Sequence, residues 1–470
     1  MSATFAIADA NPANVQPSNS TEAAANTSLS ASAPATTQAN APEITPKNNT
    51  LIPVALPTKP YTVRFEQINA GDTAWMMVST ALVLLMTIPG LVLFYAGMVR
   101  KKNVLSTALQ SFVVCCLVSV IWVCIGYTLA FTPGSTSFLG GFDRAMLSGL
   151  SYIKATSELS VSHLAPSIPE SVFVMFQMTF AIITPALIVG AFAERMRFIA
   201  MIIFMSLWSV IVYAPVAHWV WEPSGWLAMS GVLDFAGGTV VHINAGAAGL
   251  VCAYMLGPRT GYGKVPFIPY NLVYTLVGAS LLWVGWFGFN AGSAVAADGR
   301  AGMAMLVTQT ATATAALTWM AIEWLRKSRI TMLGAASGAV AGLVAITPAS
   351  GFVDVKGALS IGLAAGIFCY WGATGLKQLL KADDALDVFG IHGIGGIVGA
   401  ILTGVFASKT IGGVEGNVTL QALAACSTLV YSAIVSWLIL LFVDFIVGLR
   451  VDAEEEDDGL DLTQHSERVL

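Results

Sequence analysis

Two histidines, His242 and His392, lie inside long apolar stretches of this 470-residue chain. An ionisable side chain within a membrane span is costly, and it therefore marks a candidate functional site. Glycines flank both histidines and would let another helix or a narrow pore come close. If the two imidazoles face each other, one ring N–H can donate to the bare nitrogen of the other, because burial favours neutral histidine. The pair would then form a polar path in an apolar lumen, suited to a small neutral molecule that both donates and accepts hydrogen bonds.

The alternative for both histidines is a structural role, in which a neighbouring carbonyl satisfies each ring. Metal or haem ligation is disfavoured, because a closed zinc site needs two further ligands and a two-haem cytochrome needs more membrane histidines. We therefore expect no metal, no cofactor and no enzymatic chemistry. His163 and His465 are expected to be solvated, and His218 is expected to make a structural hydrogen bond at a helix end.

An aspartate precedes each buried histidine by eight residues: Asp234 before His242, and Asp384 before His392. Both aspartates are expected to cap the helix that carries the histidine. A carboxylate just outside a pore would also stabilise an approaching cation, and for Asp234 the two roles are compatible. The repeated spacing indicates two related halves.

Aromatic residues supply a second candidate feature. Phe180, Trp221 and Phe289, together with the Ser293 hydroxyl, could form a cation site. An aromatic face attracts an ammonium-type ion by about 0.5–2 kcal/mol when partly desolvated. Each ring taken singly more often serves packing or an interfacial aromatic belt than ligand binding.

A membrane-embedded framework must position these residues. The chain is 56% hydrophobic and only 10% charged, whereas soluble domains carry about 25% charged residues. Thr73 to Val99 and Asn103 to Gly141 contain no charged residue. Stretches of about 20 such residues cross the bilayer as helices, which satisfy their own backbone groups. The six cysteines lie in apolar segments without a CxxC pair, which indicates core residues and not disulfides.

The expected fold class is an all-α integral membrane protein with eleven transmembrane helices, arranged as an inverted 5+5 repeat plus one extra helix. The expected spans are 73–99, 104–131, 171–193, 198–220, 238–257, 271–291, 301–325, 331–349, 357–376, 388–408 and 419–448.

Loop charge predicts the orientation of these spans. Most basic residues lie in the loops that follow odd-numbered spans: Arg100, Lys101, Lys102, Arg195, Arg197, Arg259, Lys264, Arg326, Lys327, Arg329, Lys377 and Lys381. The opposite loops contain fewer: Arg144, Lys154, Arg300, Lys356 and Lys409. The positive-inside rule therefore places the N-terminus outside and the C-terminus in the cytoplasm, in the cell inner (plasma) membrane.

Three regions follow from this pattern. Residues 1–70 are rich in Ala, Ser, Thr, Asn and Pro, which predicts a disordered tail or an atypical leader. Residues 71–449 form the transmembrane domain, and residues 450–470 form an acidic cytoplasmic tail. No nucleic-acid partner is expected.

Five long motifs resemble the bacterial ammonium transporter family, within the superfamily of ammonium transporters, methylammonium permeases and Rhesus proteins. They are MTIPGLVLFYAGMVRKKN (86–103), LIVGAFAERMRF (187–198), LDFAGGTVVHINAG (233–246), GWFGFNAGS (285–293) and DVFGIHGIGGIVG (387–399). The likeness runs from about residue 73 to the C-terminus and leaves the N-terminal segment uncovered.

The resemblance implies a homotrimer of eleven-helix subunits, each with its own pore. By motif, Phe180, Trp221 and Ser293 match the outer ammonium site, and Asp234 matches its supporting carboxylate. An insertion between Trp221 and Asp234 adds Trp226, which leaves open which tryptophan faces the ion. A second set matches deeper parts of the pathway: Phe180 and Phe289 as the gate, and His242, His392 and Trp286 as the pore.

The mechanism implied by the resemblance is recruitment and deprotonation of ammonium, passage of ammonia, and separate transfer of the proton, which makes uptake electrogenic. Potassium cannot give up a proton and would be excluded. The alternatives are an ammonium sensor, which would need an added signalling domain, and a Rhesus-type gas channel, which a tryptophan at the outer site disfavours. The segment 448–461 resembles the family's tail, which implies control by a cytoplasmic P-II-type signal protein.

Overall fold

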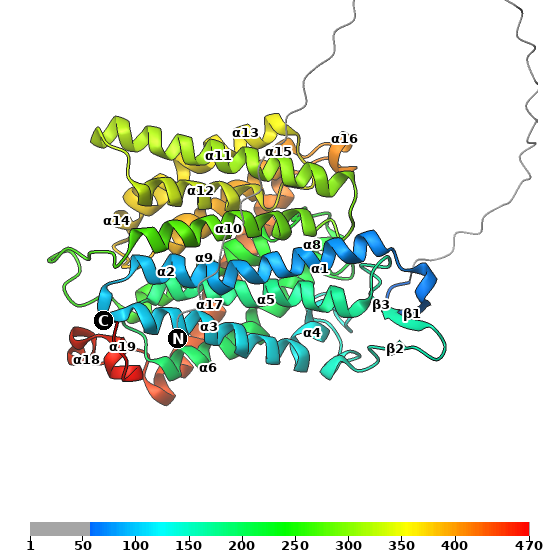
Figure 1. Ribbon diagram of the computed structural model, residues 1–470, viewed down its shortest axis with the longest axis horizontal. Coiled ribbons are helices and arrows are strands. Elements are labelled where there is room, and N and C mark those ends of the chain that lie inside the picture. Colours follow the sequence, from blue (N-terminus) through cyan, green and yellow to red (C-terminus); the bar gives the residue numbers. More distant parts are fainter. Residues whose placement is uncertain (1–56, 470) are drawn as a thin grey trace, which may run out of the picture. The chain divides into compact units, whose positions relative to one another are not determined.

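The computed structural model describes residues 57–469, and in it long helices lie side by side in roughly one direction (Figure 1). The two ends of this bundle differ. A small sheet of β1 (Tyr61–Arg64), β2 (Tyr152–Ile153) and β3 (Glu158–Val161) lies at one end, called here the sheet end. The C-terminal helices α18 (Ala453–Asp458) and α19 (Leu460–His465) lie at the other end, called here the tail end.

Nine helical segments within residues 57–469 are long and apolar enough to cross a membrane. They are Ala70–Met98, Lys101–Phe131, Glu170–Phe192, Phe198–Met229, Gly238–Leu256, Leu272–Gly292, Val355–Leu380, Phe389–Phe406 and Val418–Val447. α11 (Gly299–Lys327) and the shorter apolar helix α12 (Met332–Ile346) lie where the seventh and eighth spans were expected. The helical, multi-span architecture predicted from composition is therefore confirmed.

The other helices have the following bounds: α1 (Ala70–Leu85), α2 (Val92–Met98), α3 (Val104–Ile121), α4 (Tyr127–Phe131), α5 (Glu170–Phe192), α6 (Phe198–Trp208), α7 (Ala214–Trp221), α8 (Trp226–Met229), α9 (Asn244–Leu256), α10 (Leu272–Gly292), α13 (Val355–Trp371), α14 (Lys377–Leu380), α15 (Ile394–Phe406), α16 (Lys409–Gly412) and α17 (Val418–Val447).

π-helical turns interrupt several spans. Two of them carry the buried histidines: Gly238–Ile243 contains His242, and Phe389–Gly393 contains His392. Such turns insert an extra residue, shift the register of the side chains that follow, and are frequent at functional sites. Periodicity in the sequence gives no sign of them.

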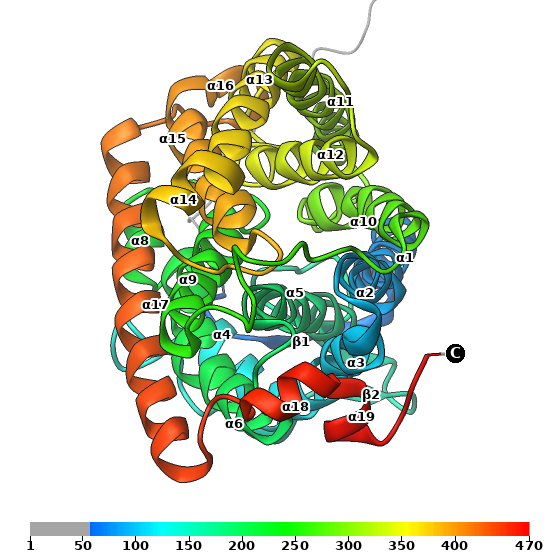
Figure 2. The same cartoon turned by 90° about the vertical axis from the view of Figure 1, so that its left-hand side faces the viewer.

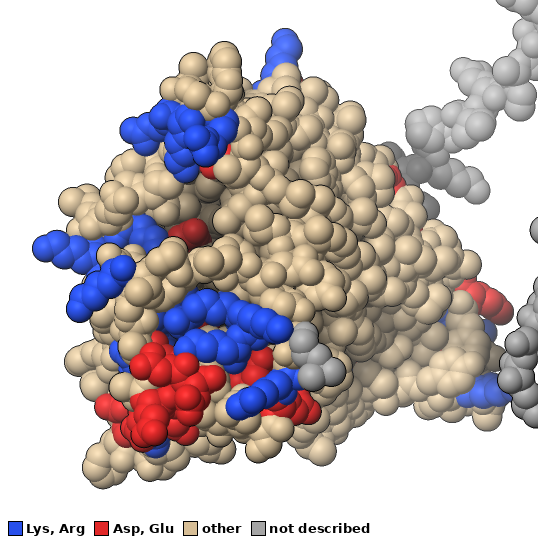
Figure 3. Space-filling model, turned by 60° about the vertical axis from the view of Figure 1, so that its left-hand side comes forward, with Lys and Arg blue, Asp and Glu red and all other residues tan. Residues whose placement is uncertain are grey.

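The helices differ in how far neighbours cover them. α5 is buried along almost its whole length, and in the view from the tail end it lies in the interior near α9 (Figure 2). α17 runs along one flank and exposes much of its apolar surface, including Phe445. Charged side chains gather at the tail end, while the visible flank of the bundle is almost free of them (Figure 3). An apolar flank between charged ends is the surface that a bilayer requires.

The segment expected to lack structure, residues 1–70, overlaps the described residues at 57–70, and there the structure differs from the prediction. β1 pairs antiparallel with β3, which also pairs with β2, so the strand order is β1-β3-β2. Val63 packs against Leu159 and Val161 on one face of this sheet. The polar composition of the whole segment gave no sign of the four-residue strand β1, because this strand is stabilised by pairing with β3, which lies far along the chain. Residues 1–56 lie outside the described part of the chain.

The tail also makes specific contacts. Glu456 of α18 is buried, and its carboxylate accepts hydrogen bonds from Arg450 Nη2 at 2.7 Å and from the backbone N–H of Thr260 at 2.7 Å. The acidic run is therefore not uniformly solvated.

Candidate functional site

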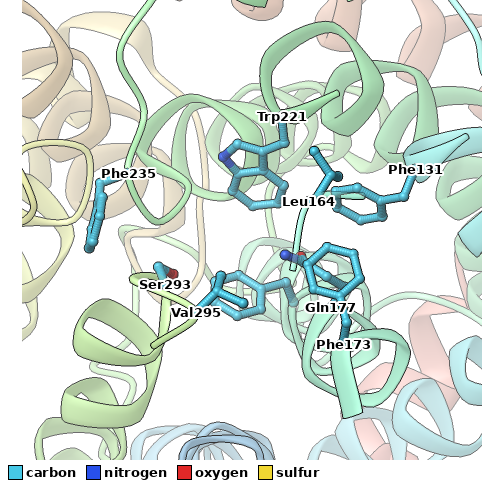
Figure 4. A pocket seen from close by; sticks show the side chains of 9 residues that line it. Phe131, Leu164, Phe173, Gln177, Trp221, Phe235, Ser293 and Val295 are labelled. Atoms are coloured by element: carbon cyan, nitrogen blue, oxygen red, sulfur yellow. The ribbon is translucent and has the colours of Figure 1, made fainter. Parts of the chain in front are cut away.

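A cavity of about 180 Å³ opens at the sheet end of the bundle. Figure 4 shows Trp221, Phe131, Phe173 and Gln177 turned toward a common space, with Phe235 and Ser293 to one side. The lining residues come from the ends of α4, α5, α7 and α10 and from adjoining loops: Phe131, Leu164, Phe173, Gln177, Phe180, Trp221, Phe235, Ser293 and Val295. Three of the predicted cation-site residues, Phe180, Trp221 and Ser293, are thus brought together.

The aromatic rings of this cavity are held by one another. The Trp221 ring stacks on Phe131 at 6.3 Å between centroids and meets the Phe180 ring edge-on at 5.8 Å. Electron-rich ring faces lining a partly desolvated space favour an ammonium-type cation.

The structure distinguishes the two tryptophans that the sequence left open. Trp221 lines the cavity, and its indole N–H donates to the backbone carbonyl of Asp234 at 2.9 Å. Trp226 does not line it, and its ring packs instead against Trp219 and Phe138.

Two polar side chains complete the cavity. The Ser293 hydroxyl donates to the Phe289 carbonyl at 2.8 Å, which leaves its oxygen free to accept from a ligand. Gln177 was missed by the sequence analysis. Its Oε1 is buried and has no hydrogen-bond partner among the described residues, so it is a second acceptor. The available signal was an amide side chain three positions before Phe180, in a helix that is mostly apolar.

Phe180, which lines the cavity, forms the predicted phenyl pair with Phe289, which does not line it. Phe180 and Phe289 are buried, with centroids 4.3 Å apart and planes tilted by 33°. Phe289 lies on the other side against His242, at 6.0 Å between centroids. The pair therefore separates the cavity from the histidines.

His242 and His392 meet behind this pair, a contact that the sequence analysis considered only as a condition. Their Nδ1 atoms are 3.3 Å apart, a hydrogen bond that requires one ring to donate and the other to accept. Gly246 makes the approach possible, because a Cβ there would lie 2.4 Å from the backbone nitrogen of Gly393. His242 Nε2 is buried and has no partner among the described residues.

A narrow cavity of about 10 Å³ runs beside the histidine pair. Trp286 lines it, and its indole N–H is directed away to the Thr347 hydroxyl at 2.9 Å. The other lining residues are apolar: Met86, Leu91, Phe94, Ile183, Leu187, Val241, Leu282, Phe289 and Val340. The space is therefore a small, largely apolar cavity that both imidazoles also line.

Asp234 is a helix cap, as predicted. Its carboxylate accepts four backbone N–H groups, from Gly237, Gly238, Thr239 and Val240, at 2.7–3.1 Å. It is not among the residues that line the sheet-end cavity. Burial raises the pKa of Asp234, and the four N–H groups oppose that rise. The side chain thus acts on the site through the backbone that carries His242 and through the carbonyl that receives Trp221.

Asp384 caps the second histidine's helix less completely. One carboxylate oxygen accepts from the Phe389 N–H at 2.7 Å, and the other has no partner among the described residues. Burial raises the pKa of Asp384 to about 6, against the opposing effect of Lys377.

Two of the three remaining histidines differ from expectation. His163 is not solvated: its side chain is 4% exposed and its Nε2 lies 3.1 Å from Glu222 Oε2. His465 is half-buried, with its ring edge-on to Phe198 at 4.9 Å. Both histidines were expected to be solvent-exposed because they lie in a loop or in the tail. Position in a loop or tail does not show whether a side chain packs against other parts of the chain. His218 makes the predicted structural hydrogen bond, with Nδ1 3.2 Å from the Ala130 carbonyl oxygen.

Comparison with known proteins places this site in a family. The profile of the Ammonium Transporter Family matches residues 74–469. An ammonium transporter of Bacillus subtilis is 49% identical over 408 residues, which cover 85% of this chain and 98% of that relative. The crystal structure of Candida albicans Mep2 is similar with a TM-score of 0.77 and 34% identity, over 84% of this chain and 89% of that one. A sensor Amt protein is similar with a TM-score of 0.77 and 29% identity, over 84% of this chain and 98% of its own. The resemblance seen in the motifs is thereby confirmed, and the chain belongs to the ammonium transporter family of multi-pass membrane proteins.

Proposed function

We propose that this transporter recruits ammonium in the sheet-end cavity, removes its proton near Phe180 and Phe289, and passes ammonia along His242 and His392. The observation that carries the proposal is the pair of touching imidazoles in an apolar lumen, behind a closed phenyl pair.

The cavity suits a cation that can also donate hydrogen bonds. Trp221 and Phe180 supply ring faces, while the Ser293 hydroxyl and Gln177 Oε1 supply acceptors. Ring attraction of about 0.5–2 kcal/mol each offsets part of the lost hydration. The site concentrates ammonium without holding it tightly.

The lumen suits the neutral base. An unpaired charge in a narrow apolar space loses its hydration and is strongly disfavoured. Ammonia carries no charge, and it can accept from and donate to the ring nitrogens that line the path. Potassium cannot lose a proton, so the lumen excludes it. The proton crosses separately, which makes uptake electrogenic.

The finer architecture is part of the same proposal. Eleven spans form an inverted 5+5 repeat plus one helix, and three subunits assemble, each with its own pore. The sheet end faces outward and the tail end faces the cytoplasm, because the basic loops gather at the tail end. Residues 71–449 are the transporter domain, and residues 450–470 are a regulatory tail that meets a P-II-type protein.

Two alternative functions predict different transport behaviour. Likeness to a sensor Amt protein gives some weight to a sensor, which would bind ammonium without sustained flux. A Rhesus-type gas channel would conduct ammonia without current.

Purified protein on a solid-supported membrane tests the proposal. Ammonium pulses are expected to give sustained currents, while potassium pulses of equal concentration give none. Equal potassium currents would refute the selectivity argument. Binding without flux would favour the sensor, and ammonia flux without current would favour the gas channel.

A further inference from the structure

A buried polar pair lies beside the sheet-end cavity and plays no part in the proposed path. His163 Nε2 is 3.1 Å from Glu222 Oε2 and 3.4 Å from Oε1, and the two side chains are 4% and 2% exposed. The Ser224 hydroxyl donates to Glu222 Oε1 at 3.3 Å. Neither His163 nor Glu222 is among the residues that line the cavity.

The chain neighbours of this pair do line it. Leu164 follows His163, and Trp221 precedes Glu222. The first wall comes from the segment between β3 and α5, and the second from the C-terminal end of α7. The pair therefore joins two walls that come from separate parts of the chain.

Both segments are held tightly around the pair. The backbone N–H of Glu222 donates to the His218 carbonyl at 3.3 Å, and the N–H of Gly225 donates to the Glu222 carbonyl at 2.8 Å. On the other side, the Leu164 N–H donates to the Ser162 hydroxyl at 3.2 Å. A displacement of Glu222 would therefore move Trp221, and a displacement of His163 would move Leu164, because each is the adjacent residue in the chain.

Burial makes the contact obligatory. A carboxyl group taken out of water without a partner is strongly disfavoured, and removing one member of the pair leaves the other buried without its hydrogen bond. The two segments are thus held together whenever Glu222 is buried.

We propose that the His163–Glu222 pair positions Trp221 and Leu164 and thereby sets the apparent ammonium affinity of the sheet-end cavity. This inference rests on the proposed function of that cavity. The pair binds no substrate itself and acts only through the walls that it joins.

The test measures ammonium-dependent current against concentration and separates the half-saturating concentration from the maximal current. Glu222→Ala is expected to raise the half-saturating concentration about fivefold or more, with the maximal current within about twofold of the wild type. Glu222→Gln is expected to restore the wild-type value, because its amide oxygen accepts the same imidazole N–H.

A matched control removes a carboxylate from an exposed pair. Glu415 Oε1 lies 3.1 Å from Lys409 Nζ, and the side chains of Lys409 and Glu415 are 70% and 71% exposed. Glu415→Ala is expected to leave both parameters unchanged, since exposed pairs contribute little. If Glu222→Ala is not recovered folded, the double variant His163→Leu with Glu222→Leu leaves neither polar side chain buried without its partner. It is expected to raise the half-saturating concentration likewise.

Three results would overturn the inference: an unchanged half-saturating concentration in Glu222→Ala or in the double variant, a loss confined to maximal current, or equal defects in Glu222→Ala and Glu222→Gln. Absence of ammonium current in the wild-type protein would instead refute the proposed function, before any variant is compared.

Discussion

The indole N–H of Trp221 donates to the backbone carbonyl of Asp234 at 2.9 Å, while the Asp234 carboxylate accepts the four N–H groups that begin the turn carrying His242. One residue therefore fixes both a wall of the sheet-end cavity and the start of the histidine helix. The sheet-end cavity and the histidine pair thus share a support, although the carboxylate does not line the cavity.

Asp234→Ala is expected to abolish selective ammonium current. Losing a capping carboxylate costs about 0.5–2 kcal/mol in ordinary helices, and here four buried N–H groups lose their acceptor. Asp234→Asn is expected to retain part of the current, because one amide oxygen still accepts. The measurement is ammonium current together with the thermal stability of the purified protein. Full activity in the alanine variant would show that the cap is dispensable.

His242→Ala is expected to lower the ratio of ammonium to potassium current. Removing the ring breaks the 3.3 Å contact with His392 and leaves space that water can enter. A wet lumen no longer discriminates against a charged ion. Currents for both ions, recorded on the same membrane, give the ratio. An unchanged ratio would remove the imidazole pair from the selectivity argument.

Trp221→Phe is expected to raise the half-saturating ammonium concentration, by about thirtyfold at most, because a phenyl ring attracts a cation less than an indole and a whole ring contributes roughly 0.5–2 kcal/mol. The substitution also removes the hydrogen bond to Asp234. Trp226→Phe is the matched control and is expected to behave like the wild type, since Trp226 does not line the cavity. The reverse ranking would assign the ion to Trp226.

Val63→Asp is expected to detach β1 from β3. Val63 is buried against Leu159 and Val161, whereas its neighbour Thr62 is exposed. A buried unpaired carboxylate is disfavoured, but the same charge at Thr62→Asp remains hydrated. Hydrogen exchange of residues 158–161 is expected to quicken only in the Val63 variant. Equal exchange in both variants would mean that β1 does not stabilise β3.

The buried ion network at the tail end predicts a pH dependence. Arg259 lies 2.8 Å from Asp383 and 3.1 Å from Glu194, and Arg100 also contacts Glu194. Burial raises the pKa of both carboxyl groups, but the neighbouring arginines more than offset this, Arg259 with Arg195 at Asp383 and Arg259 with Arg100 at Glu194. Both pKa values therefore lie below their usual range. The folded protein then binds fewer protons than the unfolded chain across that range, so stability increases with pH there and is constant above it.

Thermal stability measured across acidic pH checks this expectation. The stabilisation should be complete at neutral pH and be lost as pH falls through the lowered pKa values. Arg259→Ala is expected to flatten the dependence and to cost about 3–5 kcal/mol, because it leaves two buried carboxylates without their main partner. The same slope in Arg259→Ala as in the wild type would assign the pH dependence to other groups.

Much of the site could be predicted from the sequence because its signals are local. Apolar runs specify the helices, and an ionisable residue inside such a run stands out whatever its surroundings, as His242 and His392 do. The aspartate eight residues before each histidine likewise indicated a cap, since capping involves only the next few residues. The long motifs indicated the family and, through it, Phe180, Trp221 and Ser293 of the cavity.

The remaining features depend on contacts between distant segments. Only the folded chain shows that the two histidines touch, that Trp221 and not Trp226 lines the cavity, and that His163 is buried on Glu222. β1 likewise exists only because β3 pairs with it. Sequence by itself determined which segments are apolar enough to form membrane-spanning helices and which residues in them are costly to bury, because burial energy follows residue type. The tertiary structure decided which of those residues meet, because close packing across the bundle is a property of all the helices together.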